Sequence, residues 1–191
     1  MTKTVLLTGA SGYIAKHVAL QLLEAGYHVR GTVRSIARGQ EISDAIRPHL
    51  SDVTDLENRL DYVSLDLTSD DGWDAAMIGI DVLVHTASPF PMTPPKHEDE
   101  LVKPAVDGAL RALKAAHKAG VTRIIMTSST AAISGSLLPA GDTAYDETNW
   151  TNPDDPDITA YTKSKTLAEK AAWDFQRETA PEMNLTIVNP G

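Results

Sequence analysis

Short apolar runs alternate with helix-like patterns along the whole chain, and this alternation limits the folds that the chain can adopt. The runs are too short for membrane spans and have the length of buried β-strands. They cover residues 4–8, 28–33, 62–65, 82–86, 123–128 and 185–188. Strands that alternate with helices form parallel sheets. We therefore predict an α/β fold with a doubly wound, six-stranded parallel sheet.

The segments between these runs carry helix and loop signals. In the first, Ile14, Val18 and Leu22 share one helical face, with Ala15 and Ala19 beside it. Further helices are expected over 38–46, ended by Pro48, and over 97–119, with Pro104 inside. Gly26 and Gly120 suit the positions that end a helix. Residues 134–157 are predicted to form a long surface loop.

Composition places the chain among ordinary globular proteins. Its 191 residues, 42% of them hydrophobic, suit a single domain, 1–191. A net charge of −9 disfavours nucleic acid and anionic membrane surfaces as partners. The chain has no cysteine, no secretory signal pattern and no apolar run long enough for a membrane span. We expect a cytoplasmic protein.

The pattern Gly9-x-x-Gly12-x-x-Ala15 joins the first predicted strand to the first predicted helix. Glycines permit a tight turn and a close approach of the backbone, and the helix N-terminus attracts a pyrophosphate. A glycine-rich turn without a ligand is the weaker alternative. The pattern favours a dinucleotide site.

Arg34 decides which dinucleotide we expect. NAD-binding folds carry an acidic residue near the end of the second strand, and residues 29–35 contain none. A guanidinium at Arg34, with Arg38 one helical turn further on, suits the 2′-phosphate of NADP(H). Both arginines could instead be solvated surface residues. For Asp66, after the third strand, an adenine contact and a turn cap are equally good readings.

Tyr161 and Lys165 stand four residues apart, so they share one face of a helix. An ammonium group near a phenol favours the phenolate, which suits proton transfer. In a chain with five tyrosines this spacing also arises by chance between exposed residues. Ser129 ends the fifth predicted strand, on the side of a parallel sheet where ligands gather.

Several motifs occur in a fixed order along the chain. They are Thr8 to Ala15, Gly31 to Ser35, Asp66 to Thr68, His85 to Pro89, Thr127 to Ser129, Tyr161 to Glu169 and Asn189 to Gly191. Together they resemble the extended short-chain dehydrogenase/reductases of the NAD(P)-dependent epimerase/dehydratase superfamily. The resemblance is strongest to the branch of dihydroflavonol reductases, cinnamoyl-CoA reductases and methylglyoxal or aldehyde reductases.

This resemblance implies a catalytic set in which Ser129 orients a carbonyl, Tyr161 donates a proton and Lys165 supports the tyrosine and holds the nicotinamide ribose. It also implies that the first and later motifs line the cofactor. With the arginines and Asp66, the expected cofactor-binding residues are Gly9, Ser11, Gly12, Tyr13, Ile14, Arg34, Arg38, Asp66, Leu67, Thr86, Ala87, Ser88, Tyr161, Lys165 and Pro190.

We therefore expect an NADPH-dependent reductase of aldehydes or ketones. The alternatives are a nucleotide-sugar epimerase or dehydratase and a non-enzymatic NADP-sensing regulator. No metal is expected, because residues 97–100 lack a ligand spacing and His85 suits a structural role. Relatives continue beyond the final Pro-Gly with a substrate lobe, so we expect exposed apolar surface on the last strand. The resemblance also implies a homodimer through 97–119 and 161–177.

Overall fold

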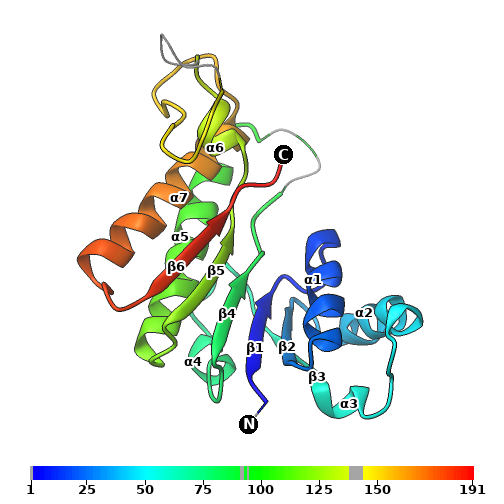
Figure 1. The fold of residues 1–191 in the computed structure, drawn as a ribbon. Helices are drawn as coiled ribbons and strands as arrows, with labels where there is room; N and C mark the ends of the chain where they lie inside the picture. Colours follow the sequence, from blue (N-terminus) through cyan, green and yellow to red (C-terminus); the bar gives the residue numbers. More distant parts are fainter. Residues whose placement is uncertain (1, 91–92, 94, 138–143) are drawn as a thin grey trace.

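The computed structural model describes residues 2–90, 93, 95–137 and 144–191. In these residues six parallel strands form one sheet in the order β3-β2-β1-β4-β5-β6 (Figure 1). The strands are β1 Thr4–Thr8, β2 His28–Val33, β3 Leu60–Ser64, β4 Val82–His85, β5 Arg123–Thr127 and β6 Asn184–Val188. The doubly wound parallel sheet predicted from the sequence is confirmed.

The strand ends differ from the sequence prediction by at most two residues. β3 begins at Leu60 and ends at Ser64, one residue before the predicted end. β4 and β5 each end one residue early, and β6 begins one residue early. The boundaries shift because hydrogen bonds to neighbouring strands, rather than apolar character, determine where a strand begins and ends.

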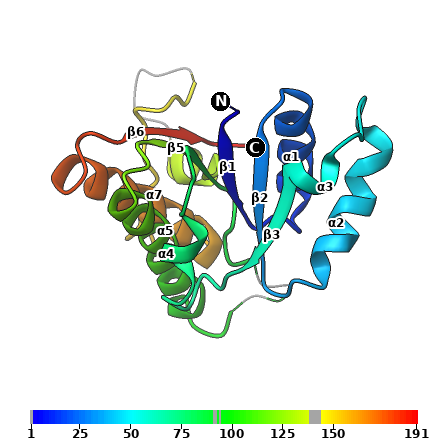
Figure 2. The same ribbon diagram turned by 90° about the horizontal axis from the view of Figure 1, so that it is seen from below.

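Helices cover the two faces of the sheet, as the view from below shows (Figure 2). One face carries α1 Tyr13–Glu24, α2 Arg38–Ile46 and α3 Leu56–Arg59, and the short 3-10 helix Arg47–His49 follows α2. The other carries α4 Trp73–Ala76, α5 Asp99–Lys118 and α7 Ala160–Glu178. A short helix, α6 Ala131–Ser134, follows β5. The sequence did not predict α6.

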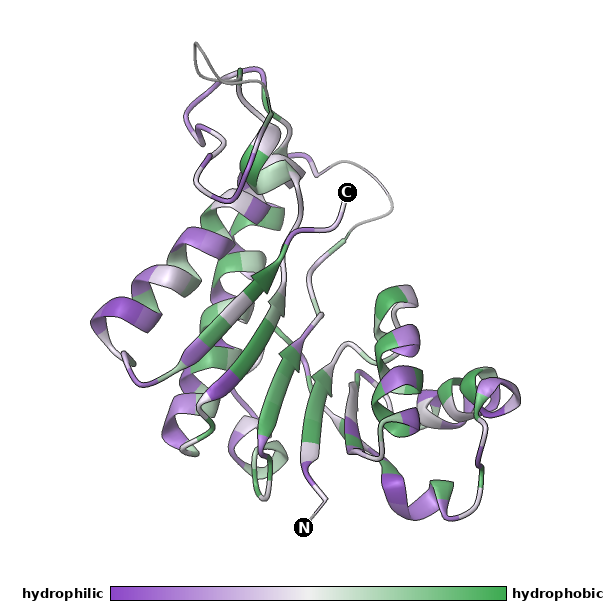
Figure 3. Cartoon of the chain, viewed as in Figure 1, coloured by the Kyte–Doolittle hydropathy of each residue, from purple (hydrophilic) through white to green (hydrophobic). Residues whose placement is uncertain are grey.

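The strands between these layers are predominantly apolar (Figure 3). Val5, Leu6 and Leu7 of β1 are completely buried, as expected for a strand covered on both faces. At the edge of the sheet, Val188 of β6 is 49% exposed. The last strand thus carries exposed apolar surface, as the sequence predicted.

The buried face of α1 overlaps the predicted one but is shifted, since Val18 and Leu22 are only partly buried against the core. The residues that face the sheet are Ala15, Ala19 and Leu23, whereas Ile14 is exposed. The helix is rotated so that small side chains meet the strands, which brings the α1 backbone close to the sheet. Gly26 has a φ of 82° and follows the helix, as predicted.

The long helix α5 begins at Asp99, within the predicted segment 97–119, and contains Pro104. Its alanines Ala105, Ala109, Ala112 and Ala116 are buried. Such small side chains allow the close packing of α5 against the sheet and α7. The predicted loop 134–157 begins at the end of α6, and the described residues 135–137 and 144–157 form neither helix nor strand. Its residues 138–143 lie outside the described part.

Among the described helices, none combines the length and the apolar character that crossing a membrane requires.

Candidate active site

A cleft of about 490 Å³ opens at the carboxyl ends of β1 to β4. The strand order reverses between β1 and β4, and ligands of doubly wound sheets bind at such a reversal. The lining residues come from the turns that follow four strands and from α4 and α5. They are Gly9, Ser11, Gly12, Thr32, Val33, Arg34, Leu65, Asp66, Leu67, Thr68, Trp73, Thr86, Ala87, Ser88, Pro89, Phe90 and Pro104.

The turn after β1 is tight and closely packed. Gly9 has a φ of 68°, and a Cβ atom at this position would lie 3.0 Å from the Ala87 Cα atom. The Gly12 amide donates to the Gly9 carbonyl at 2.8 Å, and the Gly9 amide donates to Thr32 Oγ1 at 3.0 Å. Only glycine satisfies both the left-handed backbone and the close approach at position 9.

Helix α1 begins at this turn, and no cap side chain accepts from its first backbone amides among the described residues. Gly12 is its N-cap residue and has no side chain to cap the first amides, and no acidic residue lies in the first turn. The first amides of a helix lack intrahelical acceptors and lie at the positive end of the helix dipole. An anion such as a pyrophosphate fits this position.

The two arginines expected to recognise a 2′-phosphate lie in different surroundings. Arg34 follows β2 and lines the cleft. Arg38 is the first residue of α2, pairs with Glu41 at 3.3 Å and is absent from the described cleft lining. The geometry therefore separates the two residues that the sequence had grouped together.

Asp66 caps the turn that follows it, which is one of the two roles that the sequence predicted for it. Its Oδ1 atom accepts from the Thr68 amide at 2.8 Å and from Thr68 Oγ1 at 2.7 Å. These two bonds are the main reason why the pKa of Asp66 is below its ordinary value, and Arg34 and Arg111 add a smaller electrostatic effect. Asp66 also lines the cleft, so a turn and a ligand contact are compatible.

His85 is a buried part of the wall of the cleft. Thr8 Oγ1 lies 2.9 Å from His85 Nδ1 and accepts from the amides of Thr86 and Ala87, both at 3.1 Å. A hydroxyl has one proton and two lone pairs, so Thr8 donates to Nδ1 and the neutral ring carries its proton on Nε2. Burial, with a smaller effect of Lys165, lowers the pKa of His85 to about 4. The structural role predicted for His85 agrees with this hydrogen bonding.

Tyr161 and Lys165 lie one turn apart near the start of α7. Thr159 caps the helix by accepting from the Thr162 amide at 3.1 Å. Lys165 Nζ is 5.8 Å from the centre of the Tyr161 ring, and the Tyr161 ring meets Phe90, which lines the cleft, edge-to-face at 5.6 Å. The predicted pair is therefore beside the cleft.

The Lys165 side chain is partly buried. Burial lowers the pKa of Lys165, and the Glu169 carboxylate opposes this effect. Glu169 is itself buried and accepts from Asn189 Nδ2 at 2.8 Å. The same amide group donates to the Ser129 carbonyl at 3.1 Å. One hydrogen-bonded chain thus connects α7, the end of β6 and the segment after β5.

Ser129 is buried at the end of β5, and its Oγ atom accepts from the Ala131 amide at 3.2 Å. Pro190 lies close to it, since the Pro190 carbonyl accepts from the Thr130 amide at 2.9 Å. The neighbouring Ser128 Oγ is buried without a hydrogen-bond partner among the described residues. Ser128 lines a small cavity together with His85 and Lys165.

The cleft gathers nine of the expected cofactor residues. These are Gly9, Ser11, Gly12, Arg34, Asp66, Leu67, Thr86, Ala87 and Ser88. Tyr13 and Ile14 lie in the first turn of α1 and are exposed, and they are not part of the cleft lining. Ser129, Lys165 and Pro190 lie outside this lining, and Lys165 shares a second, small cavity with Ala87 and Ser88.

Three residues that shape the site lie in the sequence motifs, but sequence reasoning assigned them no role of their own. Thr32 holds the glycine turn, Thr8 joins His85 to the Thr86 and Ala87 amides, and Glu169 is the buried neighbour of Lys165. The polar residues within the apolar runs of β1 and β2 were a signal that could have identified the first two. Glu169 is one helical turn beyond Lys165, and that spacing also was available in the sequence.

The strand order and the cleft at its reversal place the protein in the Rossmann-like α/β class. The sequence assigns the chain to a family within this class. The chain belongs to the NAD dependent epimerase/dehydratase family, whose family model matches residues 5–191.

Three relatives illustrate the similarity. Anthocyanidin reductase from Vitis vinifera is 35% identical over 182 residues, which cover 92% of this chain and 52% of the relative. The crystal structure of Gre2 from Candida albicans in complex with NADPH is 32% identical, with a TM-score of 0.82. The structure of yeast methylglyoxal/isovaleraldehyde reductase Gre2 complexed with NADPH is 30% identical, with a TM-score of 0.79. Both alignments cover 98% of this chain and 57% of the other.

Proposed function

We propose that this chain binds NADP(H) in the cleft and that the protein of which it is part reduces an aldehyde or ketone. The main support for this proposal is that one cleft contains the glycine turn, the uncapped N-terminus of α1 and Arg34. The NADPH named for two similar structures supports the choice of cofactor. The reductase names of the relatives support the class of reaction.

The residues of the cleft would hold different parts of the cofactor. The α1 N-terminus, with Gly9 and Gly12, would take the pyrophosphate, because no cap side chain occupies its first amides in the described part of the chain. Arg34 would take the 2′-phosphate, since its guanidinium keeps its charge at every relevant pH. Asp66 and Leu67 would meet the adenine, and the backbone of 86–88 would lead towards the nicotinamide.

The bound cofactor would supply a hydride, and the chain would supply the proton. Tyr161 Oη is the proposed donor to the substrate oxygen, with the Lys165 ammonium 5.8 Å from the centre of its ring. Ser129 Oγ accepts from the Ala131 amide, so its hydroxyl proton remains available for the same substrate oxygen. Ser129 and Tyr161 thereby have different roles, one orienting the carbonyl and one transferring the proton.

Titration with NADPH and NADH tests the cofactor assignment. Arg34→Met should weaken NADPH binding by about 10- to 100-fold, because a charge-assisted hydrogen bond contributes about 1.5–3 kcal/mol. NADH binding should change little. Arg38→Met is the matched control, since Arg38 pairs with Glu41 outside the cleft lining. Equal affinity of the unaltered protein for both cofactors would contradict the role of Arg34.

A panel of aldehydes and ketones with NADPH tests the reaction. Tyr161→Phe should lower kcat at least about 100-fold, the usual contribution of a general acid. Tyr145→Phe is the control, because the Tyr145 hydroxyl donates to the Ser136 carbonyl at 2.6 Å. NADPH binding without reduction, and without any effect of Tyr161→Phe, would support a sensing protein. Conversion of a nucleotide sugar would support the epimerase alternative.

The homodimer through α5 and α7 also remains a proposal. Sedimentation of the protein at working concentration tests it, and a monomer would contradict it.

A further inference from the structure

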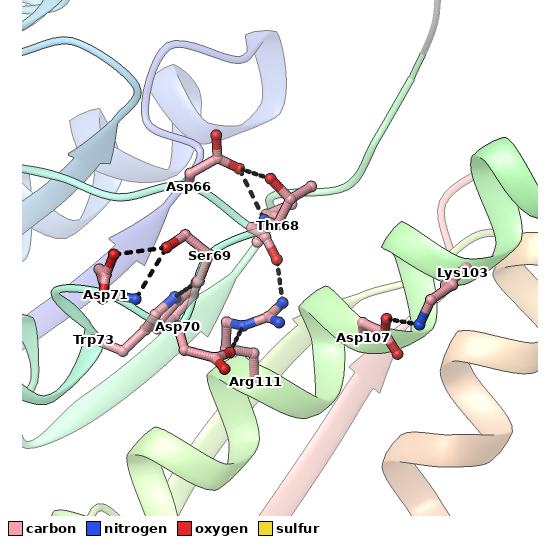
Figure 4. A network of polar contacts seen from close by, with 10 residues as sticks. Asp66, Thr68, Ser69, Asp70, Asp71, Trp73, Lys103, Asp107 and Arg111 are labelled. Carbon is pink, nitrogen blue, oxygen red and sulfur yellow. Dashed lines mark hydrogen bonds and ion pairs between the residues drawn. The ribbon is translucent and has the colours of Figure 1, made fainter.

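The turn after β3 is one wall of the cleft, and it is built from residues 66–70. Asp66, Leu67 and Thr68 line the cleft. The two bonds from Thr68 to Asp66 Oδ1 close the turn, as Figure 4 shows, and the Ser69 amide donates to the Asp66 carbonyl at 3.3 Å (Figure 4). These bonds set the shape of the turn but do not attach it to the rest of the protein.

Arg111 of α5 attaches the turn. Its Nη1 atom donates to the Leu67 carbonyl, and its Nε atom donates to Asp70 Oδ1. The Arg111 side chain is only 19% exposed, although it carries a permanent charge. The planar guanidinium offers both donors in a fixed geometry, so one side chain holds two points of the turn.

The same face of α5 makes room for the turn. Gly108 precedes Arg111 by one helical turn, and a Cβ atom at position 108 would lie 3.3 Å from the Leu67 Cβ atom. Pro104, a further turn back, lines the cleft. On the other side of the turn, Trp73 Nε1 donates to the Ser69 carbonyl at 3.1 Å. Leu67 is therefore seated directly on α5.

Two other cations of α5 lie in different settings. Lys103 pairs with Asp107 on the helix itself, and Lys118 pairs with Asp74 of α4. The side chains of both lysines are at least 70% exposed. Neither pair includes a residue of the 66–70 turn.

We propose that Arg111 is a positioning residue for the adenine half of the nucleotide, because it fixes the 66–70 turn against α5. This inference rests on the proposed NADP(H) site. The Leu67 side chain is apolar and cannot form hydrogen bonds. Its position in the cleft therefore depends on its packing against α5 and on the bond from Arg111 to its carbonyl. When the Arg111 bonds are lost, the turn can move while the glycine turn and Arg34 stay in place.

The test compares ligands that occupy separate halves of the cleft. Adenosine 2′,5′-bisphosphate probes the adenine half and reduced nicotinamide mononucleotide probes the other half, both by titration calorimetry. Arg111→Met should lower the affinity for the adenosine ligand about tenfold and leave the affinity for the nicotinamide ligand unchanged. Lys118→Met removes the same charge from the same helix and should leave both affinities unchanged. Hydrogen exchange of the amides of 66–70 should be faster in Arg111→Met only.

Two further variants separate positioning from charge and from stability. Arg111→Lys keeps the charge but lacks the fixed, planar pair of donors that reaches both Leu67 and Asp70, so we expect intermediate affinity. Gly108→Ala favours the helix, because alanine has the higher helix propensity, yet its Cβ atom would crowd the Leu67 side chain. Gly108→Ala should lower the affinity for the adenosine ligand without lowering the unfolding temperature. This variant remains informative if Arg111→Met fails to fold.

Any one of four results would overturn the proposal. They are unchanged adenosine-ligand affinity in Arg111→Met or in Gly108→Ala, equal loss of both ligands in Arg111→Met, and wild-type affinity in Arg111→Lys. Each of these leaves the NADP(H) site intact. Failure of the unaltered protein to bind NADPH would instead refute the proposed function, so the two failures are distinguishable.

Discussion

Lowering the pH from 7 to 5 should destabilise this protein through His85. The ring is 3% exposed, and its Nδ1 atom accepts from Thr8 Oγ1, whose lone pairs both serve backbone amides. A protonated ring would direct a third donor at Thr8 Oγ1, which has no free lone pair, and would bury a charge near Lys165. Protonation in the folded state is therefore opposed by burial, by geometry and by charge.

The size of the effect follows from the pKa of His85, which is about 4 when folded and near 6.5 when unfolded. The unfolded chain takes up the proton first as the pH falls. The free energy of unfolding is therefore constant above the unfolded value and decreases between pH 6.5 and pH 4. At 1.36 kcal/mol per pH unit the full loss is about 3 kcal/mol, of which about 2 kcal/mol occurs by pH 5.

Urea unfolding at pH 7 and pH 5 measures this loss through tryptophan fluorescence, with buried Trp73 as a probe. In His85→Asn, the Asn Oδ1 atom can still accept from Thr8 and does not titrate, so the loss should be smaller than in wild type by about 2 kcal/mol. The other histidines are common to both proteins and cancel. Equal losses in the two proteins would refute the reasoning, as would a titration of the His85 ring near pH 6.5 by NMR.

Three further predictions concern the turns and the lysine. Gly9→Ala and Gly26→Ala should each lower the free energy of unfolding by about 1–2 kcal/mol, because each places an alanine in the left-handed region. Of the two positions, Gly9 alone has atoms within 4 Å of the new Cβ. Gly9→Ala should therefore lower the unfolding temperature more and weaken NADPH binding, and equal effects would contradict this. Thr32→Val leaves the Gly9 amide without its acceptor and should cost about 1–3 kcal/mol in urea unfolding. A loss well below that range would be inconsistent with the bond. Glu169→Gln removes the attraction that opposes burial at Lys165, so the pKa of Lys165 should fall further, measured by the Cε chemical shift; an unchanged titration would argue against this coupling.

The positions of the strands could be predicted from the sequence because burial on both faces requires unbroken apolar runs. The glycine turn was predictable for a similar reason: Gly9 and Gly12 stand between a strand and a helix, and this local pattern is visible in the sequence, although the close approach of Ala87 to Gly9 is not. The placement of Tyr161 and Lys165 on one helical face also needed only their spacing. These features depend on residues close together in the chain, so a linear pattern contains them.

The tertiary structure alone decided which residues meet across long separations. His85 and Thr8 are 77 positions apart, and Arg111 and Leu67 are 44 apart. It also decided that Arg34, and not Arg38, lines the cleft, and that α1 turns Ala15 rather than Ile14 to the sheet. Such contacts depend on how finished helices and strands pack together. Periodicity within one segment carries no information about which residue of a distant segment will face it.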